Sequence, residues 1–225
     1  MKKTILALSA VILYIGSAYA VPMKGPYFLK KGQMEVGVEA NFVARRDIED
    51  ITTNIQNSQF FYCMAFGLFD WLNIEAKYGS GDIKNDQYND QKFYYNYNWG
   101  GGYGLRIKAY ENDKMKIILG VHHISIHPDP NKNTDNSTHR VILDETQSDM
   151  TFSLKGERLS PYAGAKVGLC RLIRRINSER ATLRSEENYG FALGFDYMFK
   201  KNVRFNFESR FVDEYALTSS VSYIF

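Results

Sequence analysis

Three histidines and a serine lie within one short segment, His122–His127, and are the residues of this sequence best suited to nucleophilic chemistry. A serine hydroxyl becomes a nucleophile when a histidine removes its proton and an acidic group orients that histidine. Side chains alternate between the two faces of a strand, so His123 and Ser125 share one face. The candidate acids, Asp144 and Glu145, follow only after a long polar stretch, and their spacing does not predict a contact with this pair.

The His-x-Ser pair is similar to that of outer-membrane deacylases, which remove acyl chains from lipopolysaccharide. The resemblance implies a lipid-modifying site on the outside of a barrel, with Ser125 as nucleophile and His123 as base. Those enzymes have Asn directly after the serine, whereas this sequence has Ile126. Histidines are also tolerated where a barrel wall meets the polar boundary of a membrane. We therefore expect no catalytic residues, and no metal site or cofactor, since His122 and His123 point to opposite faces.

Charged side chains at alternate positions of the predicted strands form a second group of candidates. Such charges could pair with one another and fill the interior of a small barrel, or they could line a narrow polar pathway that selects solutes. We expect the first arrangement, a largely plugged lumen, and keep a low-conductance passage for small solutes as the alternative. The predicted lumen residues are Glu35, Glu39, Glu75, Lys77, Arg106, Lys108, Lys116, Lys155, Glu157, Lys166, Asp196, Arg204, Glu208 and Arg210.

Arginines are concentrated in the segment 171–187, which contains five of them together with three glutamates. We expect a long external loop that is partly helical. Guanidinium groups bind phosphate in a bidentate manner, so this loop could contact the phosphates of lipopolysaccharide. The alternative is ordinary solvated charge on a loop.

These residues need a scaffold, and the sequence after residue 32 predicts one made of strands. In Met34–Phe42, for example, apolar side chains at every second position alternate with Glu35, Gly37, Glu39 and Asn41, a period that belongs to strands rather than helices. The same pattern predicts ten strands, with eight as the fallback. Their residues are 34–42, 59–68, 72–79, 98–109, 114–126, 147–157, 161–171, 189–199, 203–211 and 215–225.

The connections between these strands are of two kinds. Residues 70–71, 112–113, 158–160 and 200–202 are predicted tight turns, whereas 44–57, 80–93, 127–146 and 172–187 are predicted long polar loops. Short turns at one end and long loops at the other are typical of bacterial outer-membrane barrels. An even number of strands also returns the C-terminus to the end at which the chain begins.

Side-chain size indicates which face of the barrel points outward. The apolar rows carry Phe, Tyr, Trp, Leu and Met, and the opposite rows are rich in Gly, Ala, Ser and Asn. The inside of a small barrel has less room than the outside, so we expect the bulky rows to face lipid. An exported soluble barrel with apolar side chains inside is the alternative. Aromatic residues expected at the two membrane boundaries are Tyr27, Phe28, Phe69, Trp71, Phe199, Tyr223 and Phe225 at the turn end, and Phe60, Tyr78, Tyr95, Tyr97 and Tyr189 at the loop end.

The first twenty residues are predicted to be a secretory signal peptide. Lys2 and Lys3 precede the apolar run Thr4–Gly16, and Ala18-Tyr19-Ala20 is a small-x-small cleavage site. Without the two lysines the formal net charge of +3 falls to about +1, which gives no reason to expect nucleic-acid binding. No later apolar run approaches the roughly 20 residues of a membrane-spanning helix, so residues 21–225 are expected to form one barrel domain.

The C-terminus carries a more specific feature. Val221, Tyr223 and the terminal Phe225 alternate with smaller residues, and this ending resembles the signal by which the barrel-assembly machinery recognises outer-membrane barrels. Ser220 stands where that signal usually has Gly. By this resemblance the chain is identified as a member of the small outer-membrane β-barrels of Gram-negative bacteria. The resemblance does not indicate a single family among them. The resemblance implies an outer-membrane location, with outer-membrane lipid, lipopolysaccharide and the assembly machinery as partners.

The sequence thus predicts an all-β fold, a closed antiparallel transmembrane barrel, and a structural or surface-interaction role as its function. A porin-like passage and a lipid-modifying enzyme remain the alternatives. Cys63 and Cys170 are more than 100 positions apart and fall on separate strands, so two buried free thiols are expected rather than a disulfide.

Overall fold

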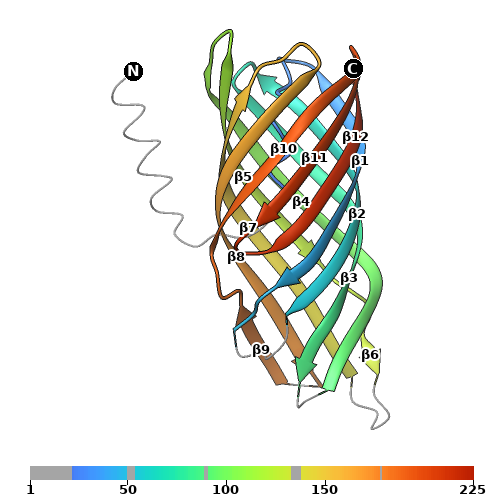
Figure 1. The fold of residues 1–225 in the computed structure, drawn as a ribbon. Helices are drawn as coiled ribbons and strands as arrows, with labels where there is room; N and C mark the ends of the chain where they lie inside the picture. Colours follow the sequence, from blue (N-terminus) through green and yellow to red (C-terminus); the bar gives the residue numbers. More distant parts are fainter. Residues whose placement is uncertain (1–21, 50–53, 89–90, 133–137, 178) are drawn as a thin grey trace.

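The computed structural model describes residues 22–49, 54–88, 91–132, 138–177 and 179–225; the predicted signal peptide lies outside these residues. Ten antiparallel strands of the described chain close into a barrel (Figure 1). Around the ring they follow the order β7-β5-β4-β3-β2-β1-β12-β11-β10-β8, and β8 pairs with β7 to complete it. The predicted closed barrel of ten strands is confirmed, and the fallback of eight is wrong.

The barrel strands differ widely in length. β4 has 21 residues and β11 has nine. At about 3.3 Å per residue β4 is roughly 70 Å long, although about ten residues suffice to cross a membrane. The strands are β1 (Met34–Arg46), β2 (Ile55–Phe69), β3 (Leu72–Tyr88), β4 (Gln91–Glu111), β5 (Met115–Ile126), β7 (Thr138–Leu154), β8 (Leu159–Ile176), β10 (Tyr189–Lys200), β11 (Val203–Phe211) and β12 (Tyr215–Ile224), and two short additional strands are β6 (Asn131–Lys132) and β9 (Glu179–Arg184).

Much of what the sequence predicts as long loops is strand. β3, β4, β7 and β8 continue past their predicted ends, and β9 folds back on β8 as a hairpin in which Ile176 pairs with Glu179. The expected partly helical segment at 172–187 is therefore wrong. On one face Ile173 lies between Arg171 and Arg175, and on the other Leu172 and Ile176 flank Arg174, so the two-residue period of a strand continues through this segment. No helix within the described residues is long and apolar enough to cross a membrane.

The predicted turn end is confirmed. β2 and β3 are joined by a turn at 70–71, and β10 and β11 by one at 201–202. β12 ends beside the start of β1, where Ile224 pairs with Glu35 and Val221 with Val38. Val221, Tyr223 and Phe225 point outward and are exposed. The last strand thus closes the barrel against the first.

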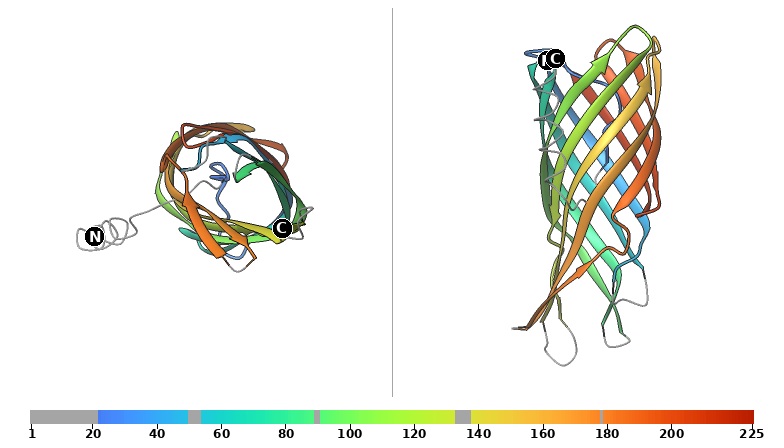
Figure 2. Two further views of the ribbon diagram at one scale, coloured as in Figure 1. Left: turned by 90° about the horizontal axis from the view of Figure 1, so that it is seen from below. Right: turned by 90° about the vertical axis from the view of Figure 1, so that its left-hand side faces the viewer.

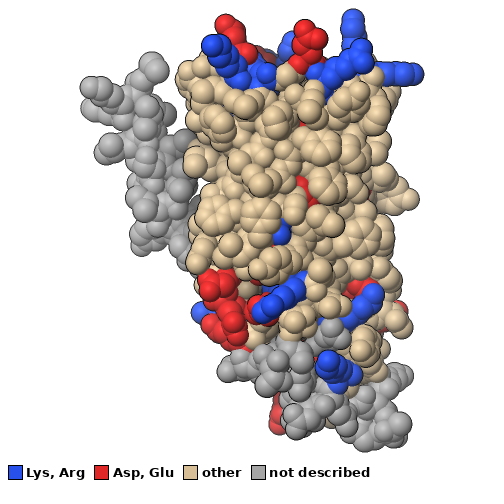
Figure 3. All heavy atoms as spheres, viewed as in Figure 1, with Lys and Arg blue, Asp and Glu red and all other residues tan. Residues whose placement is uncertain are grey.

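The outward face is apolar over a broad belt, and the inward face is polar. On β1, Val36, Val38 and Phe42 are exposed, whereas Glu39 and Asn41 between them are buried. Charged side chains gather at the two ends of the molecule and leave between them a belt with few charges (Figure 3). The predicted orientation of the two faces is confirmed, and it is the arrangement that transmembrane barrels present to lipid.

Residues 22–33 precede the first strand; residues 22–29 lie inside the barrel, and the exposed residues 30–32 lie at its turn-end rim, beside the turn between β2 and β3 (Figure 2). Met23 and Leu29 are almost completely buried, and Phe28 is 7% exposed. The prediction that Tyr27 and Phe28 belong to an outward aromatic belt is wrong. Both rings lie against lumen cations: Phe28 against Lys108, at 5.4 Å, and Tyr27 against Arg204, at 5.6 Å.

One side of the barrel is much shorter than the other. The β11–β12 hairpin ends at residues 212–214, while its flanking strands β1 and β10 connect to segments that continue beyond it. Past the tip of the hairpin those two segments meet directly: Ile48 pairs with Ser185, and the Glu49 amide donates to the Arg184 carbonyl at 2.8 Å. This contact, the 48–185 bridge, lies between β1 and β9.

An apolar core fills the interior at the loop end. Phe61, a bulky residue within the polar row of β2, is 2% exposed and belongs to this cluster. Tyr95 is 1% exposed and also points inward, so its predicted place in the outward belt is wrong. Cys63 and Cys170 are free thiols, as predicted, but only Cys170 is buried; the expected burial of Cys63 is wrong, since it is partly exposed. The members of the cluster are Ile48, Ile55, Phe61, Ile83, Phe93, Tyr95, Ile124, Ile126, Val141, Leu143, Cys170 and Leu172.

Candidate functional site

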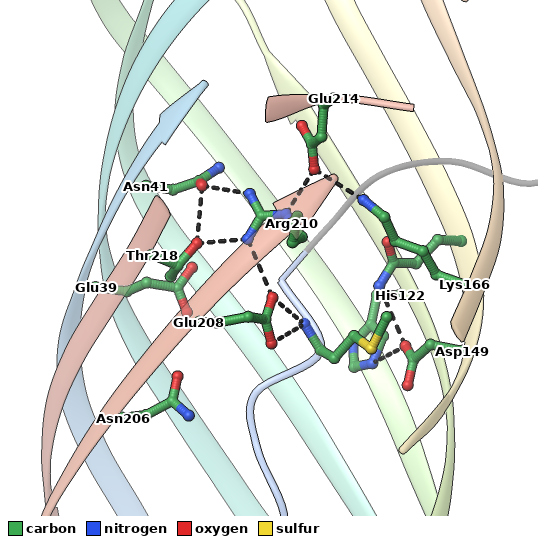
Figure 4. Close-up of polar contacts among 12 residues, drawn as sticks. Glu39, Asn41, His122, Asp149, Lys166, Asn206, Glu208, Arg210, Glu214 and Thr218 are labelled. Carbon is green, nitrogen blue, oxygen red and sulfur yellow. Dashed lines mark hydrogen bonds and ion pairs between the residues drawn. The ribbon is translucent and has the colours of Figure 1, made fainter. Parts of the chain in front are cut away.

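The middle of the lumen contains a network of buried charges centred on Arg210 of β11 (Figure 4). The Arg210 side chain is completely buried. Its guanidinium donates to Glu214 at 2.5 Å and Glu208 at 3.1 Å, and to the oxygens of Thr218 and Asn41, both at 2.5 Å. Every nitrogen of this guanidinium therefore has an acceptor, which compensates the loss of water around a buried cation.

The carboxylate of Glu214 contacts three cationic side chains. It accepts from Arg210 of β11, from Lys166 of β8 at 2.8 Å, and from Arg46 at the end of β1. Burial opposes ionisation of Glu214, but these cations outweigh it and hold the pKa of the carboxyl well below its ordinary value. For neighbouring Asp213, burial dominates and raises the pKa, although Lys166 lies 2.9 Å away.

The turn that carries these two carboxylates has an unusual backbone. Val212 adopts a φ of 91°, a left-handed conformation that is strongly disfavoured for a β-branched residue. Such strain costs on the order of 1–3 kcal/mol and persists only where surrounding contacts fix it. The contacts that Asp213 and Glu214 make with the lumen cations provide that fixation.

The N-terminal segment is bound to the network through Glu208. Both carboxylate oxygens accept from the Met23 backbone amide, at 3.1 and 3.2 Å, and Tyr162 of β8 donates to the same carboxylate at 2.8 Å. The described part of this segment, drawn in blue in Figure 4, thus begins beside the central charges.

Towards the turn end the lumen charges hold the backbone of this segment. Asp196 accepts from the Tyr27 amide at 2.8 Å, and Arg204 pairs with Asp196 at 3.0 Å and with Glu35. Arg106 donates to the carbonyl of Tyr27 at 3.1 Å and to that of Gly25. Glycine is required at position 25, since a Cβ there would lie 2.5 Å from the Asp196 carboxylate and φ is +63°.

Further ion pairs, and one contact between a histidine and a carboxylate, connect the strands with one another and with the N-terminal segment. Lys77 of β3 pairs with Glu39 of β1 at 2.5 Å. Lys24 of the N-terminal segment lies 3.2 Å from Glu75, and His122 of β5 lies 3.1 Å from Asp149 of β7. All of these side chains are buried, so both signs of charge are distributed through the lumen in contact with each other.

Of the fourteen predicted lumen residues, two lie outside the lumen. β7 ends at Leu154, and the exposed Lys155 and Glu157 belong to the turn that follows. The alternation cannot be carried through a turn, which is why the prediction is wrong for them. Lys108 and Lys116 lie at the turn-end rim, 2.7 and 3.7 Å from Glu111. The others lie inside: Glu35, Glu39, Glu75, Lys77, Arg106, Lys166, Asp196, Arg204, Glu208 and Arg210.

The prediction missed several buried charges. Arg46 and Arg174 lie in strand ends that the sequence assigns to loops, and they pair with Glu145 and Asp86 respectively. Asp149 follows two positions after the buried Gln147, so the two-residue period of β7 could have identified it. No sequence pattern indicated that the N-terminal segment enters the lumen.

The candidate nucleophile on β5 has partners that the sequence did not predict. Asp144 of β7 is directly opposite Ser125, and its carboxylate lies 3.6 Å from His123, the expected base, but His123 is not the histidine that bonds to the serine. Ser125 bonds to His127 at 3.0 Å, and the His127 ring stacks on Trp99 at 3.9 Å. A catalytic triad needs the acid on the histidine that contacts the serine, and here the acid faces the other histidine.

Within the residues that the structure describes, no three His, Cys, Asp or Glu side chains are grouped so that they could hold a metal ion.

Comparison with known proteins finds distant structural likenesses and no family. No family model matches the chain, and no curated protein matches it. Similar solved structures include the transport unit of the autotransporter AIDA-I from Escherichia coli (10% identity, 96% of each chain covered, TM-score 0.48) and the translocator domain of the autotransporter NalP from Neisseria meningitidis (10% identity, 100% of this chain and 95% of that one, TM-score 0.47). The outer membrane protease OmpT from Escherichia coli is another (11% identity, 89% and 99%, TM-score 0.42).

The wall itself gives a clearer assignment. An even number of antiparallel strands, short turns at one end, long extensions at the other and an outward apolar belt occur together in outer-membrane barrels. The chain is a β-barrel of the outer-membrane type.

Proposed function

We propose that this chain is an integral outer-membrane protein whose closed lumen serves stability, and whose role is structural or one of surface interaction rather than catalysis or transport. The observation that carries the proposal is the complete burial of Arg210 between Glu208 and Glu214, with the Met23 amide bound to the same Glu208. Water cannot hydrate these groups, so they stabilise the barrel by satisfying each other.

Three successive layers of the lumen support a closed barrel. The N-terminal segment lies at the turn end, the charge network around Arg210 lies in the middle, and the apolar core around Phe61 lies at the loop end. An aqueous channel requires continuous polar space, which the apolar layer interrupts.

The first prediction concerns conductance. Mature protein refolded into a planar bilayer should show little single-channel current, because each layer excludes water. A low-conductance passage is the alternative function, and it makes a different prediction. In a hydrated channel water would screen Arg204, so that Arg204→Ala would shift ion selectivity and leave the melting temperature unchanged. A well-resolved wild-type current with that shift would establish transport as the function.

The second prediction concerns orientation. Glu179 lies at the tip of the β8–β9 hairpin, and Asn112 lies in the turn after β4. A cysteine at Glu179 should react with an impermeant maleimide on intact cells, and one at Asn112 should react only after the outer membrane is permeabilised. The natural chain is the control, since Cys170 is buried and Cys63 half-buried. Labelling of Asn112→Cys on intact cells would contradict the orientation. Thr134 and Ser178, which belong to the loops predicted at 127–146 and 172–187, lie outside the described residues.

A further inference from the structure

The outward face of the loop-end extension contains a groove of about 450 Å³ between β4, β7, β8 and β9. Its walls include three arginines from three different strands, Arg140, Arg175 and Arg180. Trp99, stacked on His127, forms a flat aromatic wall. Cationic groups and a broad aromatic surface therefore line the same hollow.

The three arginines lie in register. Arg140 of β7 pairs with Arg175 of β8, and Arg175 pairs in turn with Arg180 of β9. Like charges placed directly opposite each other on a sheet destabilise it. Within the described part of the chain, none of these three side chains makes an ion pair or a side-chain hydrogen bond, in contrast to the paired arginines of the lumen. Three exposed guanidinium groups in one row form a surface that an anion would stabilise.

The groove also has an apolar floor. Ile142 and Ile173 pair with each other one step closer to the barrel on the same outward face. A ligand that fits must therefore combine anionic groups with a less polar body. A small inorganic anion would use the arginines and leave the aromatic and aliphatic walls without contact.

The height of the groove relative to the belt favours a membrane component. Arg175 lies six residues beyond Leu169, where the continuous apolar row of β8 ends. Six residues extend about 20 Å along the strand, or about 14 Å above the belt for a strand tilted near 45°. The phosphorylated sugars of an outer-leaflet glycolipid lie in this zone, directly above their acyl chains.

We propose that this groove binds the phosphorylated saccharide head of a lipopolysaccharide. The guanidinium groups of Arg140, Arg175 and Arg180 bind phosphate oxygens, which they can do in bidentate fashion. Trp99 and the two isoleucines contact the sugar rings. The inference rests on the proposed outer-membrane location, and it gives the surface-interaction role a partner and a site.

The test measures the binding of a phosphorylated rough lipopolysaccharide to purified protein in non-ionic detergent. The chain has two tryptophans, so Trp99 fluorescence reports on the groove in a Trp71→Phe background. Replacing Arg140, Arg175 and Arg180 with Gln should weaken binding about tenfold or more, because several charge-assisted hydrogen bonds are lost. The matched control replaces three exposed cations of the turn end, Arg158, Lys200 and Lys201, with Gln and should bind as the natural chain does.

Dephosphorylated lipopolysaccharide should bind the natural chain as weakly as the phosphorylated form binds the triple variant. Equal weakening of the triple variant and its control would indicate general charge attraction and overturn the proposal. Equal binding of the two lipopolysaccharides would also overturn the proposal. Full competition by millimolar inorganic phosphate would overturn it as well, because it would identify a site for free anions. If the triple variant does not fold, as judged by heat-modifiable migration, Arg175→Gln alone should weaken binding several-fold.

Binding in detergent does not depend on where the protein resides in the cell. If surface labelling contradicts the orientation while lipopolysaccharide still binds, the proposed function is wrong and the proposed binding site stands. If labelling agrees with the orientation but lipopolysaccharide does not bind, only the proposed binding site is wrong.

Discussion

Replacing Arg210 with Met should destabilise the barrel by about 3–5 kcal/mol, the cost typical of removing one partner from a buried ion pair. The variant keeps most of the side-chain volume but leaves Glu208 and Glu214 without their shared cation. Unfolding by guanidinium chloride in detergent, followed by tryptophan fluorescence, measures the loss.

Two further variants separate this effect from a general sensitivity to lost charge. Arg45 neighbours Arg46 in sequence but points outward, where it pairs with Asp47 at 2.9 Å in solvent. Arg45→Met should leave stability nearly unchanged, because exposed ion pairs are screened by water. Adding Glu214→Gln to Arg210→Met should cost less than the sum of the single changes, since the two side chains contact each other. Strict additivity would contradict the network.

Placing a cation on the belt should have the second-largest effect. Phe195 of β10 points outward and packs against Phe205 and Phe207 of β11, with ring centroids 6.1 and 5.8 Å apart. Phe195→Arg should cost roughly 2–4 kcal/mol, the range for a cation near the middle of a bilayer. The same unfolding measurement in lipid vesicles gives the value.

The control for this change must remain apolar. Phe195→Leu keeps the side chain compatible with lipid and should cost much less than Phe195→Arg. Gly194, although it faces the lumen, does not offer a mild substitution: an added Cβ would lie 2.4 Å from the Phe207 carbonyl oxygen and 2.6 Å from the Tyr162 ring. Equal losses for Phe195→Leu and Phe195→Arg would mean that this ring does not face lipid.

The wall of the barrel could be predicted because its period is local. Each strand repeats the contrast between a lipid-facing and a lumen-facing side chain every second residue, as Val36, Val38 and their neighbours Gly37 and Glu39 show. That contrast fixed the face of most lumen charges, and with it the candidates Arg204, Glu208 and Arg210.

The partners of those charges could not be predicted, because they depend on register and on chain folding across the lumen. Glu214 contacts Arg46, which is 168 positions away in the sequence, and Lys166, which is 48 positions away. The path of residues 22–33 is set by hydrogen bonds from backbone groups, such as the Met23 amide to Glu208, and backbone groups have no sequence signature. The strand extensions were not predicted because lysines, arginines and aspartates interrupt their apolar rows, and charged residues of this kind are also typical of loops.

The 48–185 bridge changes the circumference of the molecule along its axis. On the turn-end side of the bridge the ring consists of ten strands. On the loop-end side, past the tip of the β11–β12 hairpin, β9 lies between β8 and β1. The described strands around the axis there are β7, β5, β4, β3, β2, β1, β9 and β8. The wall therefore tapers to eight strands, a size whose interior is just filled by side chains. The apolar core lies at this narrow end, so removal of the N-terminal segment would leave a cavity that is open at the turn end and closed at the loop end, rather than a continuous channel.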